Sequence, residues 1–235
     1  ATRWLIQAAR EAGARRFVHI SSLSVYAVER DGITVDEQSP YDSEAGARGG
    51  YSRSKLAADR VALYEAKQGA PVVVLRPGLL YGPGRRPPLA RQSFQAGSFK
   101  LLLARRHYPL PLTYVDNVAD AVVLALRAEG IEGQAFTIVD DNVPQGFYVD
   151  LFRQISGEKW KPVLLPVPLV ALAAKALERG LRLARRRSPI TYHQVRRATD
   201  AANFDCRRAR ETLGWTPRVS LREGLQRCFA TKSES

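Results

Sequence analysis

The chain has 235 residues, 45% of them hydrophobic and 25% charged, a globular composition long enough for one sizeable domain with a smaller lobe. The net charge of +13 is high, but the Arg residues are scattered and no stretch interleaves basic with aromatic residues, so no nucleic-acid partner is expected. The two cysteines fit neither a disulfide framework nor a metal site, and the three histidines are far apart without other ligands nearby. No metal is expected, and the expected location is the reducing cytoplasm.

The longest apolar run, residues 163–174, contains Pro166 and Pro168 and is too short to span a bilayer. A transmembrane helix is therefore not expected, while peripheral contact with a membrane is left open. The chain contains no Met and begins directly in a helical pattern at Ala1. This beginning indicates a piece of a longer protein.

The first half of the chain alternates helical and strand patterns. Residues 17–20 are nearly all apolar, which is typical of a strand buried on both faces of a parallel sheet, and Gly13 ends the helical pattern before it. In chain order the predictions are a helix at 2–13, a strand at 17–20, a loop at 29–50, a helix at 51–67, a strand at 71–77 and a turn-rich loop at 78–84.

The second half continues the alternation and then becomes mostly helical. The predictions are a helix around 89–96, a helix at 118–128 capped by Asp116 and Asn117, a strand at 135–139, and helices at 147–156, 166–184 and 220–230, with a stop and turn at 213–217. The order helix, strand, helix, strand, helix, strand predicts an α/β fold with a doubly wound parallel sheet, followed by a smaller helical lobe.

Tyr51 and Lys55 lie four positions apart near the start of a predicted helix, so both side chains can point into one site. A tyrosine ordinarily has a pKa of about 10, too high for a base at neutral pH, and a neighbouring ammonium lowers that pKa. The pair is therefore a candidate proton shuttle. The serine-rich residues 21–26 follow the first strand at its carboxyl end, where open parallel sheets bind ligands.

Five segments together resemble the extended short-chain dehydrogenases/reductases, the group that includes the NAD-dependent epimerase/dehydratases. They are residues 21–26 (SSLSVY), 51–55 (YSRSK), 75–84 (LRPGLLYGPG), 114–119 (YVDNVA), and 213–217 with 220–224 (LGWTP and SLREG). Their order and spacing cover nearly the whole chain. The resemblance implies a Rossmann-type fold and an oxidoreductase that uses NAD or NADP.

The resemblance also implies roles for single residues. Ser22 matches the serine that hydrogen-bonds the substrate oxygen, Tyr51 matches the general acid/base, and Lys55 matches the residue that binds the nicotinamide ribose and lowers the tyrosine pKa. The implied sets are Ser22, Tyr51 and Lys55 for catalysis, Tyr51, Lys55, Pro77 and Gly78 for the cofactor, and Ser22, Ser24, Leu79 and Leu110 for the substrate. His19, within a buried strand, is interpreted as structural.

The family's cofactor signature is missing from this chain. Members open with a strand and a Gly-rich turn that brings the dinucleotide pyrophosphate to a helix amino terminus, and no such glycine spacing occurs here. Residues 1–140 are therefore interpreted as the C-terminal part of a dinucleotide-binding Rossmann domain, with 85–112 contributing to the lobe, and 141–235 as the substrate-binding lobe. We expect the chain alone to be inactive.

Two positions bear on the substrate. Nucleotide-sugar members usually carry an Asn where this chain has Leu79, and commonly an Arg shortly before the Asp116–Asn117 motif, where residues 109–114 hold no cation. Both departures resemble the 3β-hydroxysteroid dehydrogenase branch and favour a small-molecule substrate with an apolar secondary alcohol. Nucleotide-sugar chemistry stays an alternative, because Arg85, Arg86, Arg105 and Arg106 could bind phosphate. A non-catalytic dinucleotide-binding protein is a further alternative.

The resemblance also implies a homodimer. Family members often dimerise through the helix that carries the Tyr-Lys pair and the helix before the serine strand. Here these are residues 52–67 and 2–13, and we expect an apolar strip on their outer face.

Overall fold

The computed structural model of the chain describes residues 1–28, 32–43, 45, 49–84, 87–88, 93–96, 98–102, 106–165, 167–183 and 202–230. Its centre is a parallel sheet of β1 (Phe17–Ile20), β3 (Val72–Pro77) and β8 (Ala135–Ile138), in the order β1-β3-β8. All six residues of β3 are buried, as expected for a middle strand covered on both faces. The predicted α/β fold with a parallel sheet is confirmed.

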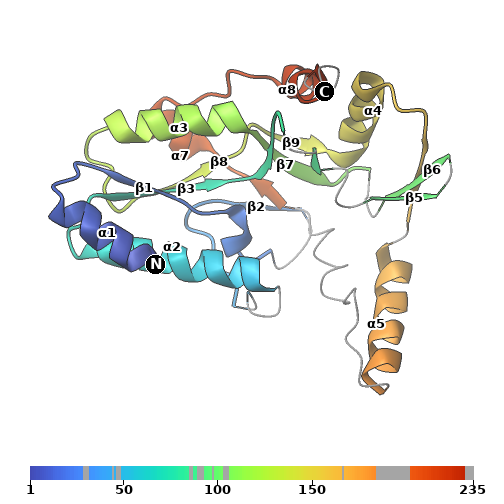
Figure 1. The fold of residues 1–235 in the computed structure, drawn as a ribbon, viewed down its shortest axis with the longest axis horizontal. Helices are drawn as coiled ribbons and strands as arrows, with labels where there is room; N and C mark the ends of the chain where they lie inside the picture. Colours follow the sequence, from blue (N-terminus) through green and yellow to red (C-terminus); the bar gives the residue numbers. More distant parts are fainter. Residues whose placement is uncertain are drawn as a thin grey trace.

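Helices cover both faces of this sheet (Figure 1). The helices α1 (Thr2–Glu11) and α2 (Gly50–Lys67) lie on one face, and α3 (Val115–Arg127) and α7 (Arg207–Leu213) lie on the other. Successive side chains of β3 point to opposite faces, as in any strand. Val72 and Val74 pack with α1 and α2, and Val73 and Leu75 join the larger core on the side of α3.

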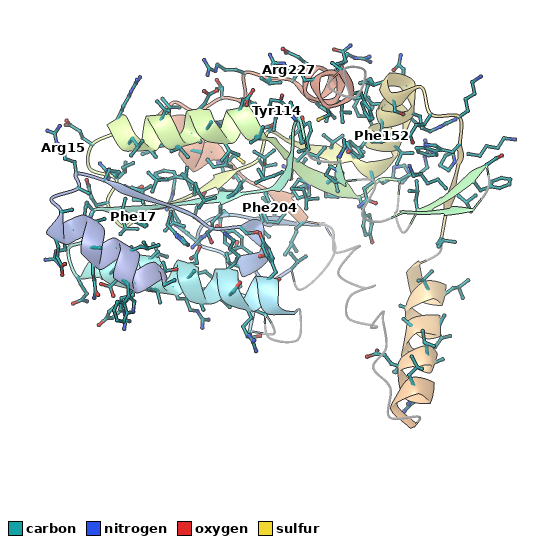
Figure 2. All side chains as sticks on the ribbon, viewed as in Figure 1. Arg15, Phe17, Tyr114, Phe152, Phe204 and Arg227 are labelled. Atoms are coloured by element: carbon teal, nitrogen blue, oxygen red, sulfur yellow. The ribbon has the colours of Figure 1, made fainter. Side chains whose placement is uncertain are left out.

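A second core lies beside the sheet, around a mixed sheet of β4 (Leu79–Tyr81), β7 (Pro109–Tyr114) and β9 (Asp141–Pro144). The helices α4 (Gln145–Ser156) and α8 (Leu221–Ala230) cover it. This core contains several aromatic rings among Leu and Val side chains. Tyr114 lies beneath Arg227, whose guanidinium carbon is 5.9 Å from the ring centroid (Figure 2). Glycine at position 224 lets α8 approach, because a Cβ there would lie 2.8 Å from Tyr114 and 2.9 Å from Tyr81.

The remaining strands are short. The strands β5 (Ser93–Ala96), β6 (Phe99–Leu102) and β10 (Lys161–Leu164) form a small sheet, and β2 (Ile33–Val35) pairs in parallel with β11 (Ala202–Phe204). The 3-10 helix η1 (Leu23–Val25) follows β1, and α5 (Val167–Leu183) stands away from the rest of the chain (Figure 1).

The C-terminal segment returns to the first core. Phe204, Cys206, Leu213 and Trp215 are buried in the cluster that contains Val73 and Leu75. Trp215 is fully buried, and its indole Nε1 donates a 2.8 Å hydrogen bond to the carbonyl oxygen of Asn117 on α3. The proposed division of the chain near residue 141 stays a prediction; residues 202–215 pack with the part of the chain that precedes it.

Several predicted elements are confirmed, and several are wrong. The helices at 2–13, 51–67, 147–156, 166–184 and 220–230 and the strands at 17–20, 71–77 and 135–139 appear within a few residues of their predicted ends. Residues 93–96 are a strand rather than the end of a helix, while 89–92 lie outside the described residues. Parts of the predicted loops at 29–50 and 78–84 are the strands β2 and β4, because both pair with distant segments.

The predicted cap of α3 is also wrong. Tyr114 occupies the cap position, and Asp116 and Asn117 lie inside the first turn. Asn117 is fully buried and bonds to distant groups: its amide nitrogen donates to Asp140 Oδ2 and to the carbonyl of Val219, and its amide oxygen accepts from the backbone N–H groups of Arg218 and Val219. The Asn117 side chain therefore joins α3 to distant segments of the chain instead of capping the helix.

Among the described residues, no helix combines the length and apolar character needed to cross a bilayer, and no cluster of three or more His, Cys, Asp or Glu residues could hold a metal ion.

Candidate active site

The serine turn lies at the carboxyl end of β1. Ser22 has an extended backbone (φ −164°, ψ 152°), caps η1, and its hydroxyl oxygen accepts a 3.2 Å hydrogen bond from the backbone N–H of Ser24. Both serines are partly exposed, and η1 packs against α2. A capping role therefore accounts for the position of Ser22.

Tyr51 and Lys55 occupy the first turns of α2. The helix begins at Gly50, after Gly49 at φ +107°, a conformation that side chains with a Cβ rarely adopt. The Tyr51 side chain is 62% exposed. Lys55 Nζ donates a 2.9 Å hydrogen bond to the carbonyl oxygen of Ile20, the last residue of β1. Lys55 thus ties the helix of Tyr51 to the strand that ends two residues before Ser22.

Pro77 and Gly78 end β3, the strand next to β1, where Ile20 pairs with Leu75. The Gly78 N–H points to two acceptors, Thr113 Oγ1 at 3.1 Å and the carbonyl oxygen of Ile138 at 3.0 Å. A Cβ at Gly78 would lie 2.5 Å from the carbonyl oxygen of Pro111, so only glycine fits here without a shift of backbone.

The two predicted substrate leucines differ in their surroundings. Leu79, next to Gly78, is 39% exposed. Leu110 is 7% exposed and belongs to the second core. A role for Leu110 in substrate binding stays a prediction, and its side chain contributes to packing.

Ser22, Lys55 and the segment Pro77–Gly78 therefore lie at one end of the central sheet, and Tyr51 is in the first turn of the helix that Lys55 ties to this end. Ser22 and Lys55 are linked through the end of β1, and Pro77–Gly78 ends the neighbouring strand. Lys55 carries three N–H donors, of which one goes to Ile20. A donor set of one ammonium, a phenol and a serine hydroxyl fits the hydroxyl groups of a ribose and an alcohol substrate, so these residues fit a nicotinamide dinucleotide.

His19 lies on β1 near this site and is partly buried. Burial lowers the pKa of its imidazole, the nearby charge of Asp59 raises it, and Lys55 lowers it further. Its Nε2 is buried with no hydrogen-bond partner in the described part of the chain. The structural role that the sequence indicates for His19 stays a prediction.

A buried charged pair that the sequence analysis does not predict lies behind the site: Asp59 on α2 is 0% exposed and Arg76 on β3 is 2% exposed. A signal was present. Asp59 interrupts the buried stripe of α2 that includes Leu56 and Ala62, and Arg76 interrupts a run of apolar strand residues. A charge at such a position needs a buried partner.

A parallel sheet with helices on both faces, and with a serine turn, a Tyr-Lys helix and a glycine at the ends of adjacent strands, defines a Rossmann-type α/β protein. Residues 1–138 match the model of the NAD dependent epimerase/dehydratase family. The chain belongs to this family.

Relatives with named activities support the same assignment. The chain is 30% identical over 244 residues to a sterol-4-alpha-carboxylate 3-dehydrogenase, decarboxylating, of Candida albicans, covering 95% of this chain and 67% of the relative. It is 28% identical over 224 residues to sterol demethylase protein B of Methylococcus capsulatus, covering 92% of this chain and 66% of that protein. The chain spans about two thirds of the length of these curated relatives.

Solved structures agree on the fold. The crystal structure of gox2253 matches with a TM-score of 0.81 at 24% identity and covers 99% of this chain and 70% of its own. The structure of MoeE5 in complex with UDP-glucuronic acid and NAD matches with a TM-score of 0.69 at 25% identity and covers 100% of this chain and 70% of its own.

Proposed function

We propose that the intact protein is an NAD(P)-dependent oxidoreductase that transfers hydride at a secondary alcohol of a small molecule. The observation that carries the proposal is the link between Lys55 and the end of β1, which holds the Tyr51 helix against the serine turn. Family membership supports it. The cofactor, NAD or NADP, supplies the hydride acceptor when it is bound.

The residues of the site divide the work. Tyr51 takes the proton of the substrate hydroxyl, and Ser22 donates a hydrogen bond to the same oxygen. Lys55 binds the nicotinamide ribose through the N–H groups that do not go to Ile20. The backbone at Pro77 and Gly78 lies against the nicotinamide.

An apolar alcohol of the 3β-hydroxysteroid kind is the favoured substrate. Leu79, beside Gly78, presents partly exposed apolar surface at the site, and Ser24 lies next to Ser22. Two relatives are named for chemistry on sterols. We further propose that Leu110 shapes the substrate side through the second core rather than by open contact.

A second candidate is nucleotide-sugar chemistry. The match to MoeE5, whose structure holds UDP-glucuronic acid and NAD, favours it. A non-catalytic dinucleotide-binding role is a third reading, and the presence of Ser22, Tyr51 and Lys55 at one end of the sheet argues against it.

Substitution of Tyr51 tests the proposal. Tyr51→Phe removes the ionisable oxygen and keeps the ring, so kcat of the intact protein should fall at least about a hundredfold while cofactor binding changes little. Tyr64→Phe is the matched control, because Tyr64 is a 53% exposed tyrosine on the same helix. The assay follows NADH absorbance with 3β-hydroxysterols, and product analysis with UDP- and dTDP-sugars detects epimerisation. Near-normal turnover by Tyr51→Phe would refute the mechanism; reaction with sugars alone would refute the substrate.

The assembly of the protein is a further part of the proposal. Trp4, Leu5 and Tyr64 are more than half exposed on the outer surface of α1 and α2, which supports a homodimer through these helices. Light scattering of the intact protein at micromolar concentration measures it. We also propose the reducing cytoplasm as the location, because both cysteines are buried thiols in the interior of the fold.

Contact with a membrane surface has separate support on α5. Leu169 and Leu172, three positions apart, are each 64% exposed, and Leu177 is 45% exposed. Lys175 and Arg179 are also exposed on this helix. Exposed leucines and cations on one helix are side chains that the surface of an anionic bilayer can bind.

The chain alone is expected to lack activity because the Gly-rich turn is missing. Titration of the 235 residues with NADH, followed by fluorescence, should give a weak, non-saturating signal. A tight, saturable signal would contradict this expectation.

A further inference from the structure

We propose that the buried pair of Arg76 and Asp59 is a positioning device, which sets the placement of the three segments that carry the candidate site. This inference rests on the proposed function. Arg76 and Asp59 touch neither substrate nor cofactor in our assignment and act through their neighbours along the chain.

One guanidinium bonds to side chains from three separate parts of the chain. Arg76 Nε donates to Asp59 Oδ2 at 3.0 Å and Nη2 donates to Asp59 Oδ1 at 2.8 Å, which makes a two-pronged pair. Arg76 Nη1 donates to the hydroxyl of Tyr26 at 2.7 Å, and Nη2 also donates to the hydroxyl of Tyr41 at 2.8 Å. Four of the five N–H donors of Arg76 are therefore engaged.

The partners also bond to each other. The Tyr41 hydroxyl donates to Asp59 Oδ1 at 2.7 Å, and the Tyr26 hydroxyl lies 3.3 Å from Thr137 Oγ1 on β8. The guanidinium carbon of Arg76 is 4.9 Å from the ring centroid of Tyr26 and 5.4 Å from that of Tyr41. Two aromatic faces and four hydrogen bonds thus restrict the guanidinium to one orientation.

Each partner is a short step from a site residue. Asp59 follows Lys55 by four positions on α2, which is about one helical turn. Tyr26 follows Ser22 by four positions, at the end of η1. Arg76 directly precedes Pro77 and Gly78. The network therefore fixes the Tyr-Lys helix, the serine turn and the end of β3 relative to one another.

The electrostatics favour the charged form of the pair. Burial alone would raise the pKa of Asp59, but the hydrogen bonds and the charge of Arg76, with a hydrogen bond from Tyr41, hold that pKa below its ordinary value of 3.8. Burial would lower the pKa of Arg76, and its bonds to Asp59 outweigh this effect and raise it. The pair therefore stays ionised at every pH where the protein would work.

We infer that the Arg76–Asp59 pair serves to orient the three segments of the site rather than to stabilise the fold. Well-packed apolar residues can replace a buried ion pair with little loss of stability. They cannot reproduce directional bonds to groups on three segments. Since a misplacement of about 1 Å at a reacting group can cost on the order of a hundredfold in rate, such bonds matter at a site that transfers a proton and a hydride.

Two single variants and one double variant of the intact protein test the inference. Arg76→Lys keeps the positive charge but loses the planar guanidinium that bonds to both Asp59 oxygens. Asp59→Asn keeps the shape of the side chain but loses the negative charge. Each should lower kcat by about tenfold to a hundredfold and leave KM within about threefold. The double variant Asp59→Leu with Arg76→Met keeps an apolar, folded interior and should lose kcat to the same extent.

A second measurement does not depend on turnover. Amide hydrogen exchange at residues 50–56 should become faster in Arg76→Lys, while exchange in α3 stays as in the wild type. The matched control is Arg218→Lys, which alters an exposed bidentate pair with Asp120 far along the chain from the site. This control should change neither kcat nor exchange in α2.

The outcomes separate this inference from the proposed function. If the apolar double variant folds and keeps kcat within about twofold of the wild type while Tyr51→Phe loses it, the inference fails and the proposed function stands. If the wild type turns over no alcohol, the proposed function fails, and unchanged exchange at residues 50–56 in Arg76→Lys would overturn the positioning role independently.

Discussion

Asp140 is expected to make the stability of this protein depend on pH near neutrality. Asp140 is the second residue after the end of β8, and it is 6% exposed. Its Oδ2 accepts hydrogen bonds from the N–H of Tyr114 at 2.6 Å and from Asn117 Nδ2 at 2.9 Å, and its Oδ1 is buried without a partner among the described residues. Burial raises the pKa of Asp140 to about 7, against the lowering effect of these two bonds, and the charge of Asp141 adds to the rise.

The sign of the effect follows from proton binding. Between pH 4 and pH 7 the unfolded chain has lost this proton, whereas the folded protein keeps it, so the free energy of unfolding falls as pH rises. The pKa moves from 3.8 to about 7. At ~1.4 kcal/mol for each pH unit, the loss over this window is about 4 kcal/mol.

Asp140→Asn should remove this dependence. The amide oxygen still accepts from Tyr114 and Asn117 but does not titrate, so the variant should gain about 4 kcal/mol relative to the wild type between pH 4 and pH 8. Urea unfolding, followed by Trp fluorescence at several pH values, gives the free energy of unfolding of each protein. The contributions of all other titrating groups cancel in the difference between the variant and the wild type. A difference for Asp140→Asn that stays within about 1 kcal/mol at every pH, or that has the opposite sign, would refute the reasoning.

Two further substitutions test packing. Gly78→Ala places a Cβ 2.5 Å from the carbonyl oxygen of Pro111 and should cost roughly 1–3 kcal/mol in denaturant unfolding, whereas Gly180→Ala in α5, with no atom within 4 Å, should be neutral or stabilising by at most ~1 kcal/mol. Equal effects of the two would contradict the close approach at Gly78. Asn117→Ala leaves buried groups of Asp140 and Val219 unpaired and should cost roughly 3 kcal/mol or more, with faster proteolysis near Trp215. Wild-type protease resistance in that variant would show that Asn117 does not hold the C-terminal segment.

The sequence was a good guide to the central layers. Residues 72–75 are all Val or Leu, and the amphipathic helices on either side of them follow patterns that depend only on nearby residues. The positions of Ser22 and Gly78 at strand ends were predictable from the same topology, because each lies within two residues of the end of a predicted strand.

The missed features depend on partners far along the chain. The three-residue strands β2 and β4 are too short to show a period, and each exists because a distant segment pairs with it. Asn117 belongs to a residue type that favours helix caps, but bonds to Asp140 and to residues 218–219 outweigh that local preference. The Arg76–Asp59 pair required knowledge of which faces of α2 and β3 meet.

The return of the C-terminal segment to α3 has a consequence for synthesis on the ribosome. Asn117 and Val219 are 102 positions apart, and translation at about 5–20 residues per second separates their appearance by roughly 5–20 s. For that interval Trp215 is absent, and the apolar side chains of α3 and β8 that share its cluster in the folded protein lack this cover. We therefore expect the nascent chain to expose apolar surface until residues 215–219 have been made, and exposed apolar surface of this kind is what chaperones bind.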